Sequence, residues 1–120
     1  MKDMKRYLIG YDIGSSSVKA SLVEAESGRC VASAFYPKTE APIIARQPGW
    51  AEQEPDSWWQ YLKEATADIM RAAQAKGDEV AAIGISYQMH GLVCVDKQGR
   101  ASDMICLWRP PHHPLPVRHA

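Results

Sequence analysis

Two short polar segments contain residue types suited to binding an anion and a small polyhydroxylated molecule. Residues 12–17 (DIGSSS) end one apolar run, and residues 88–91 (QMHG) follow another. A tight turn between two strands can direct consecutive backbone N–H groups into one concavity, where hydroxyl side chains add further donors for phosphate oxygens. The two commonest phosphate-binding glycine patterns, GxxxxGK[ST] and GxGxxG, are absent. Phosphate binding would therefore need a different turn.

The first segment supplies donors, a cation and a carboxylate. Gly14 lets phosphate oxygens approach the backbone closely, and Asp12 could hold a hydrated Mg²⁺, which prefers few carboxylates and several waters. The remaining candidates are three hydroxyls and one ammonium group: Ser15, Ser16, Ser17 and Lys19. An ordinary polar hairpin accounts for these six residues equally well.

The second segment combines hydrogen-bonding groups with apolar contact. Gln88 and His90 can donate and accept, Met89 offers apolar surface, and Gly91 leaves space. This mixture suits a polyol or sugar, although His90 taken alone is more typical of a satisfied loop histidine. Ligands collect outside strand ends in sheets covered by helices, so we expect both segments to open at one edge of a sheet.

Three consecutive strands must position the first segment. Residues 7–13 are an apolar run, residues 17–25 alternate apolar and polar, and residues 30–37 follow a turn at 24–29. Short connections predict an antiparallel meander that ends at Pro37. Residues 38–54 lack periodicity and predict a long loop.

A helix and a fourth strand must position the second segment. Pro55 suits a first helical turn with Asp56 beside it. A buried stripe is predicted at helical spacing, with Trp59 and Met70 beside it and Gly77 as the stop: Trp58, Leu62, Ala65, Ile69 and Ala73. A buried strand (79–86), a break (87–91) and a hairpin (92–96 with 101–108) follow. The expected fold is α/β, a mixed sheet with one main helix on one face.

Composition excludes several classes of protein. Of 120 residues, 46% are hydrophobic and 23% charged, with 14 basic against 14 acidic side chains. This balance predicts one soluble domain and does not favour nucleic acid or an anionic membrane as partner. No run suits a membrane span or secretory signal. We expect Cys30, Cys94 and Cys106 to be buried as small hydrophobic side chains. Their unpaired arrangement predicts a protein of a reducing compartment, the cytoplasm.

Residues 109–120 differ from the rest of the chain. They hold four of the eight prolines and three of the four histidines, which predicts an extended or disordered tail. Metal binding by His112, His113 and His119 is the weaker interpretation, because no carboxylate or cysteine lies among them.

Three motifs in this order resemble the start of a carbohydrate kinase of the FGGY family. They are residues 7–22 (YLIGYDIGSSSVKASL), 49–59 (GWAEQEPDSWW) and 83–100 (IGISYQMHGLVCVDKQGR). The resemblance covers residue 7 to about residue 108, and the QMHG version is similar to that of the xylulokinases.

The resemblance implies an actin-like, ribonuclease-H-type fold and phosphorylation of a sugar hydroxyl, with ATP and Mg²⁺ as cofactors. By the same resemblance, Asp12, Gly14, Ser15 and Ser16 fall on the segment for phosphate and Mg²⁺. Gln88, Met89 and His90 fall on the sugar-contacting segment. Trp50 and Gln53 could line the sugar end, while Trp58 and Trp59 are expected in the core.

The sequence departs from the family after Trp108. Family members continue there with an aspartate and an arginine, then with the aspartate that deprotonates the sugar and a second domain. Here Arg109, Pro110 and Pro111 follow. We therefore expect residues 1–108 to be the N-terminal part of the first domain and residues 109–120 a foreign tail, from a truncated gene, a frameshift or a gene-model error.

Such a fragment lacks the catalytic base, so we expect it to be inactive alone and to self-associate through uncovered surface. Two alternatives stay open. One is a non-enzymatic remnant or binding module of actin-like fold. The other is a different actin-like ATPase, against which the QMHG segment argues.

Overall fold

The computed structural model describes residues 5–46, 48–89, 91–101 and 105–108, the last four by their backbone. The chain divides into two compact units. The first comprises residues 1–42 and 56–88, and the second comprises residues 43–55 and 89–120. The predicted tail, 109–120, lies outside the described residues.

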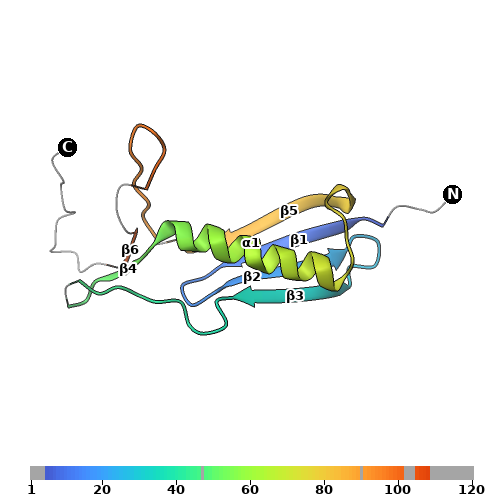
Figure 1. Cartoon of the computed structure of the whole chain (residues 1–120), viewed down its shortest axis with the longest axis horizontal. Helices are drawn as coiled ribbons and strands as arrows, with labels where there is room; N and C mark the ends of the chain where they lie inside the picture. The colour runs from blue at the N-terminus through green and yellow to red at the C-terminus, as the bar shows by residue number, and fades with distance from the viewer. Residues whose placement is uncertain (1–4, 47, 90, 102–104, 109–120) are drawn as a thin grey trace. The chain divides into compact units, whose positions relative to one another are not determined.

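The first unit is built on a four-stranded sheet in the order β3-β2-β1-β5 (Figure 1). Strands β1 (Tyr7–Ile13), β2 (Val18–Glu24) and β3 (Cys30–Tyr36) form the predicted antiparallel meander. Strand β5 (Val80–Tyr87) pairs in parallel with β1. The predicted mixed sheet is confirmed.

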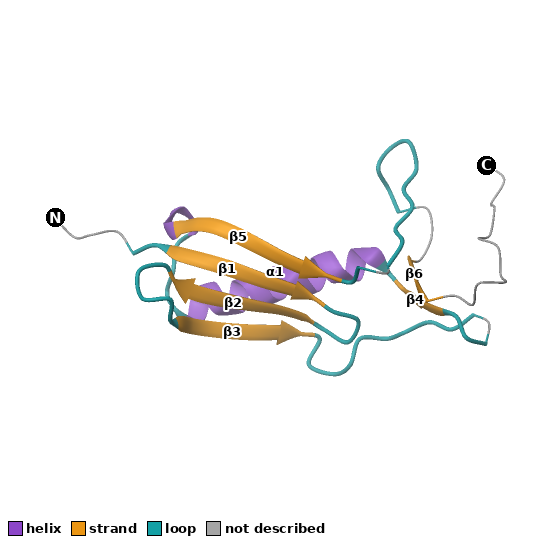
Figure 2. Ribbon diagram, turned by 180° about the vertical axis from the view of Figure 1, so that it is seen from behind, coloured by secondary structure: helices purple, strands orange, loops and turns teal. Residues whose placement is uncertain are grey.

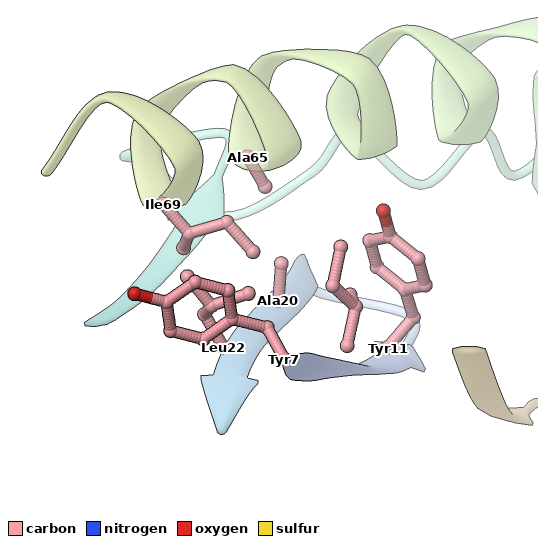
Figure 3. Packing of buried hydrophobic residues seen from close by; sticks show 7 residues of the cluster. Tyr7, Tyr11, Ala20, Leu22, Ala65 and Ile69 are labelled. Atoms are coloured by element: carbon pink, nitrogen blue, oxygen red, sulfur yellow. The ribbon is translucent and has the colours of Figure 1, made fainter. Parts of the chain in front are cut away.

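Helix α1 (Pro55–Ala72) covers one face of this sheet (Figure 2). Alternate residues of β1 are buried and exposed, so one face of the strand points to the helix. The buried cluster joins β1, β2 and α1 through Tyr7, Ile9, Tyr11, Ala20, Leu22, Ala65 and Ile69 (Figure 3). Burial of one large aliphatic side chain contributes about 1.5–3 kcal/mol.

Two hydrogen bonds connect the sheet to the helix. The Thr66 hydroxyl donates to the Leu62 carbonyl (2.7 Å), so the 2.6 Å contact of Tyr11 with Thr66 has the tyrosine hydroxyl as donor. The Tyr36 hydroxyl donates to Asp68 Oδ2 at 2.8 Å. This hydrogen bond to Asp68 is the main cause that raises the pKa of Tyr36 above its ordinary value, with desolvation adding to it.

The end of α1 differs from the prediction. Gln74, not Gly77, takes the left-handed conformation (φ 51°) that ends the helix, and Gly77 instead begins a 3-10 turn, η1 (Gly77–Glu79). The Ala75 amide donates to the Met70 carbonyl at 2.9 Å and the Gln74 amide to the Arg71 carbonyl at 3.1 Å. This is a Schellman motif with a non-glycine residue at its left-handed position, so spacing to the next glycine did not locate the helix end.

Replacing Gln74 with glycine should raise the free energy of unfolding by about 0.5–1 kcal/mol, because glycine adopts a positive φ without a Cβ penalty. Urea denaturation measures the change. The matched control is Gln60→Gly, at an exposed position away from the ends of α1. It should lower the free energy of unfolding by about 1 kcal/mol. Destabilisation by both substitutions would contradict the assigned helix end.

The predicted burial of the last sheet strand and of three other side chains is wrong. Seven of the eight residues of β5 are exposed, because β5 is an edge strand and the cluster under α1 comes from the other strands. Trp59 is 61% exposed and lies beside Lys63, whereas Trp58 is half-buried. Cys30 and Cys94 are exposed: Cys30 begins the opposite edge strand and Cys94 lies outside any strand.

The second unit corrects the predicted loop and hairpin. The predicted loop contains strand β4 (Ala51–Gln53), which pairs antiparallel with β6 (Ile105–Trp108) instead of leaving 105–108 to pair with 92–96. Only the Val95–Ala101 bridge of the expected hairpin is present in the described residues. Amide donors of Arg100 and Gln98 hold the pKa of Asp96 below its ordinary value and fix this turn.

The contrast between α1 and β5 can be measured with one substitution at two positions. Ile69 is fully buried and Ile83 is 57% exposed. Ile69→Val should lower the free energy of unfolding by about 0.5–1.5 kcal/mol, and Ile83→Val should change it by less than about 0.5 kcal/mol. Equal losses in urea denaturation would show that β5 is covered in solution.

Candidate functional site

Parallel pairing brings the ends of two strands together that are far apart in sequence. The register sets Asp12 opposite Ser86 and Ile13 opposite Tyr87. The turn after β1 and residue Gln88 after β5 therefore lie at the same end of the sheet, where these two parallel strands finish. The expected convergence holds this far. Met89 and Gly91 belong to the second unit, and His90 lies outside the described residues.

Asp12 lies on the sheet face opposite α1, because its neighbour Tyr11 points into the core. Its carboxylate is exposed and accepts a 3.2 Å hydrogen bond from the Ser86 hydroxyl. On its other side, the antiparallel register pairs Asp12 with Lys19. Sequence reasoning selected Asp12 and Lys19 but missed Ser86, which only the register of β1 and β5 could have indicated.

The serine-containing turn is closed by its own backbone. The Gly14 amide donates to the Ser17 carbonyl at 3.0 Å, and a Cβ on Gly14 would lie 3.1 Å from that oxygen. The Gly14 N–H is thus used within the turn, so donors for a bound anion must come from its neighbours. Ser15 and Ser16 are exposed, and the Ser16 carbonyl accepts from the Ala41 amide at 2.8 Å, which fixes the turn to the segment after β3.

Gln88 carries an unusual polar group. Its Nε2 is buried and has no hydrogen-bond acceptor among the described residues. A buried donor without a partner costs about 1–3 kcal/mol, so native proteins satisfy nearly all of them with protein, water or ligand oxygens. A ligand hydroxyl is an acceptor of the required kind, and the predicted sugar segment begins at this residue.

The other predicted ligands are less constrained. Met89 is 82% exposed, and Gly91 is half-exposed. Trp50 is half-buried and Gln53 is 2% exposed in the second unit. No group of three metal-ligating side chains occurs within the described parts of the chain. The histidines at 112, 113 and 119 lie outside them.

Asp12 as a single carboxylate suits a Mg²⁺ ion that keeps most of its waters. The exposed position of the carboxylate leaves room for those waters, and the Ser86 hydroxyl fixes one of its oxygens. Across the described part of the chain, no helix is long and apolar enough to cross a membrane.

Comparison with known families identifies the class of protein that this sheet and its strand-end turns define. Residues 7–113 match the N-terminal domain of the FGGY family of carbohydrate kinases. The chain belongs to this family, and its sheet order, helix and meander are those of the family's actin-like first domain.

Within the family, the chain is similar to xylulose kinases. It is 41% identical over 106 residues to xylulose kinase of Escherichia coli K12, covering 83% of this chain and 19% of that protein. Xylulose kinase of Bacillus subtilis 168 is 32% identical over 103 residues, covering 86% and 20%. A crystal structure of a xyloylose kinase from Brucella ovis matches with a TM-score of 0.75 at 30% identity, covering 84% and 20%. The chain thus spans about a fifth of these relatives.

A methyl group at Gly14 tests the closed turn. Gly14→Ala should lower the free energy of unfolding by about 1 kcal/mol, because its Cβ presses on the Ser17 carbonyl and the turn must open. Gly10→Ala is the matched control, since nothing lies within 4 Å of its Cβ in strand β1. That substitution should be neutral or stabilising by up to about 1 kcal/mol. Equal melting temperatures for the two variants would contradict the turn geometry.

Proposed function

We propose that this chain is a nucleotide- and sugar-contacting segment of an ATP-dependent sugar kinase, with a ketopentose such as xylulose as the sugar. The single observation that carries the proposal is the parallel pairing of β1 with β5, which sets the Asp12 turn beside Gln88. Family membership and the similarity to xylulose kinases support the reaction class. The cytoplasm, where ATP and free sugars occur together, is the proposed location.

In this proposal the turn after β1 serves the nucleotide. Asp12 holds Mg²⁺ through water. The donors of Ser15 and Ser16, next to Gly14, and the Lys19 ammonium group face the terminal phosphates. Opposite charges on Asp12 and Lys19, neighbours across β1 and β2, suit a site that binds a metal ion and a phosphate together. When bound, Mg²⁺–ATP supplies the phosphoryl group and neutralises charge developing on it.

The segment after β5 serves the sugar. The buried Nε2 of Gln88 donates to a sugar hydroxyl, and Met89, His90 and Gly91 provide apolar contact, a second polar group and space. Phosphoryl transfer depends on positioning and electrostatic stabilisation, so these contacts contribute by holding the hydroxyl in line with the phosphate.

The isolated chain should show no turnover, because no general base is among its predicted site residues. Loss of a general base alone lowers rates by about 10²–10⁴-fold. We expect a coupled ADP-release assay with xylulose to show no activity above background for the 120-residue chain. Turnover by this chain would contradict the proposal that it is only one part of a kinase.

A chimaera tests the assigned residues. Residues 1–108 replace the matching segment of the Escherichia coli xylulose kinase, which should yield an enzyme active on xylulose. Asp12→Asn should then lower kcat/KM by about 100-fold or more, as expected for loss of metal and phosphate positioning. Gln88→Ala should raise KM for xylulose by about tenfold, equivalent to one buried hydrogen bond.

The control in the chimaera is Asp78→Asn, an exposed acidic residue in η1 at the other end of β5. It should leave kcat and KM within about twofold, as surface substitutions do. An active chimaera that tolerates Asp12→Asn and Gln88→Ala as well as it tolerates Asp78→Asn would refute the proposed site.

A further inference from the structure

Asp12 has two neighbours in the sheet that could hold its carboxylate in place. The parallel register sets it opposite Ser86 on β5, and the antiparallel register sets it opposite Lys19 on β2. All three side chains are exposed. An exposed side chain without a partner changes rotamer within nanoseconds. A ligand site that depends on Asp12 therefore needs a neighbour that fixes its carboxylate.

Of these two neighbours, the serine makes the contact. The Ser86 hydroxyl donates a hydrogen bond to Asp12 Oδ1 at 3.2 Å. Among the described residues, no ion pair joins the Lys19 ammonium group to this carboxylate. The two neighbours thus differ, although the sheet register brings both of them beside Asp12.

The kind of donor matters for what the carboxylate can bind. A hydroxyl is neutral, so Asp12 keeps its negative charge while one of its oxygens is held. A paired ammonium group would neutralise that charge and compete with a metal ion. In the described part of the chain, Asp12 Oδ2 accepts no hydrogen bond. A single free carboxylate oxygen of fixed direction suits a Mg²⁺ ion that keeps most of its waters.

We propose that Ser86 is a positioning residue, which orients the Asp12 carboxylate toward a hydrated Mg²⁺ ion and leaves the Lys19 ammonium group to the phosphate. The inference rests on the proposed function, because it needs Asp12 as the residue that holds the metal ion. Ser86 acts through Asp12 and contacts neither the metal ion nor a substrate.

The position of Ser86 in β5 supports such a role. Residues 80–85 (VAAIGI) carry no polar side chain, so Ser86 is the first polar residue of the strand. Its side chain lies on the face opposite α1, as that of its partner Asp12 does, and is not part of the buried cluster. Contacts between exposed side chains contribute little to stability. The main effect of this hydrogen bond is therefore on the direction of the carboxylate.

Manganese as a paramagnetic probe tests this role in the 120-residue chain. Mn²⁺ takes the same oxygen ligands as Mg²⁺. A small amount of Mn²⁺ speeds the NMR relaxation of nearby amides in proportion to the occupancy of its site. In the wild-type chain, the amides of residues 13–17 should relax faster when Mn²⁺ is added. Ser86→Ala should reduce this effect about fivefold, because loss of one hydrogen bond changes affinity by about that factor.

Three further variants separate the hydroxyl from other causes. Ser86→Thr keeps a hydroxyl and should stay within about twofold of the wild-type effect. Ser33→Ala is the matched control, since it removes an exposed hydroxyl on β3 that has no hydrogen-bond partner in the described chain. It should also stay within about twofold. Lys19→Met should leave the effect unchanged or increase it, because it removes a positive charge beside a cation site.

Melting temperatures show whether any loss of the effect comes from unfolding. Substitutions at Ser86, Ser33 and Lys19 should leave the melting temperature within about 4 °C of the wild-type value, because all three side chains are exposed.

The variant Asp12→Asn distinguishes failure of this inference from failure of the proposed function. Equal relaxation in the wild-type chain and Ser86→Ala, with the effect lost in Asp12→Asn, would overturn the role of Ser86 and leave Asp12 as the metal-holding residue. Loss of the effect in Lys19→Met would assign the orienting role to the lysine and overturn the inference. A wild-type chain without the effect, or an effect that persists in Asp12→Asn, would refute both the metal-holding role of Asp12 and the inference that rests on it.

Discussion

The parallel pairing of β1 with β5 is the constraint on which the rest of this structure depends. It joins residues more than 70 positions apart: the hydroxyl of Ser86 reaches the carboxylate of Asp12. Parallel strands cannot be joined by a tight turn, so the chain must cross the sheet between them. Here the crossing segment includes α1, whose buried face completes the core over β1 and β2. The same crossing segment therefore supplies the helix of the core and leads the chain into the β1–β5 pairing at the candidate site.

This arrangement explains why the polar residues lie where they do. The core side of β1 is formed by Tyr7, Ile9 and Tyr11, so its last carboxylate is directed to the opposite face at the end of the strand. The tight turn that follows is fixed internally at Gly14 and externally by the Ala41 amide. A rigid meander thus presents a short, polar, solvent-facing turn, while β5 delivers Gln88 next to it. Precise ligand sites benefit from such support by regular elements.

Local sequence patterns predicted the meander, the helix and the residues that converge at the end of β1. Short turns and period-two alternation determine the meander, and the stripe from Leu62 to Ile69 determines the helix face. Burial was predicted less well, because it depends on what lies across from each side chain. Trp59 and Ile83 look like core residues until the number of strands under the helix is known. The same limit applies to residues 51–53 and 105–108, whose pairing joins distant segments.

The candidate site residues were selected through residue type and resemblance, not through geometry, and their roles stay a prediction. Asp12 and Gln88 stood out as polar residues at strand ends. Ser86 did not, because a serine within an apolar strand carries no signal until its cross-strand neighbour is known. The helix end was missed for a related reason. Gln74 takes the left-handed conformation in a motif of backbone hydrogen bonds, and these cannot be predicted from the residue type at position 74.

The hydrogen bond between Tyr36 and Asp68 has a consequence at alkaline pH. It requires a protonated phenol, and it holds the pKa of Tyr36 above the ordinary 10.0. A group whose pKa is raised on folding contributes stability that is complete below the unfolded value and disappears as pH rises through the folded value. Below pH 10.0 the bond between β3 and α1 is therefore fully available. In strong base, ionisation of this single tyrosine sets two negative charges against each other and loosens the outer strand of the sheet from its helix.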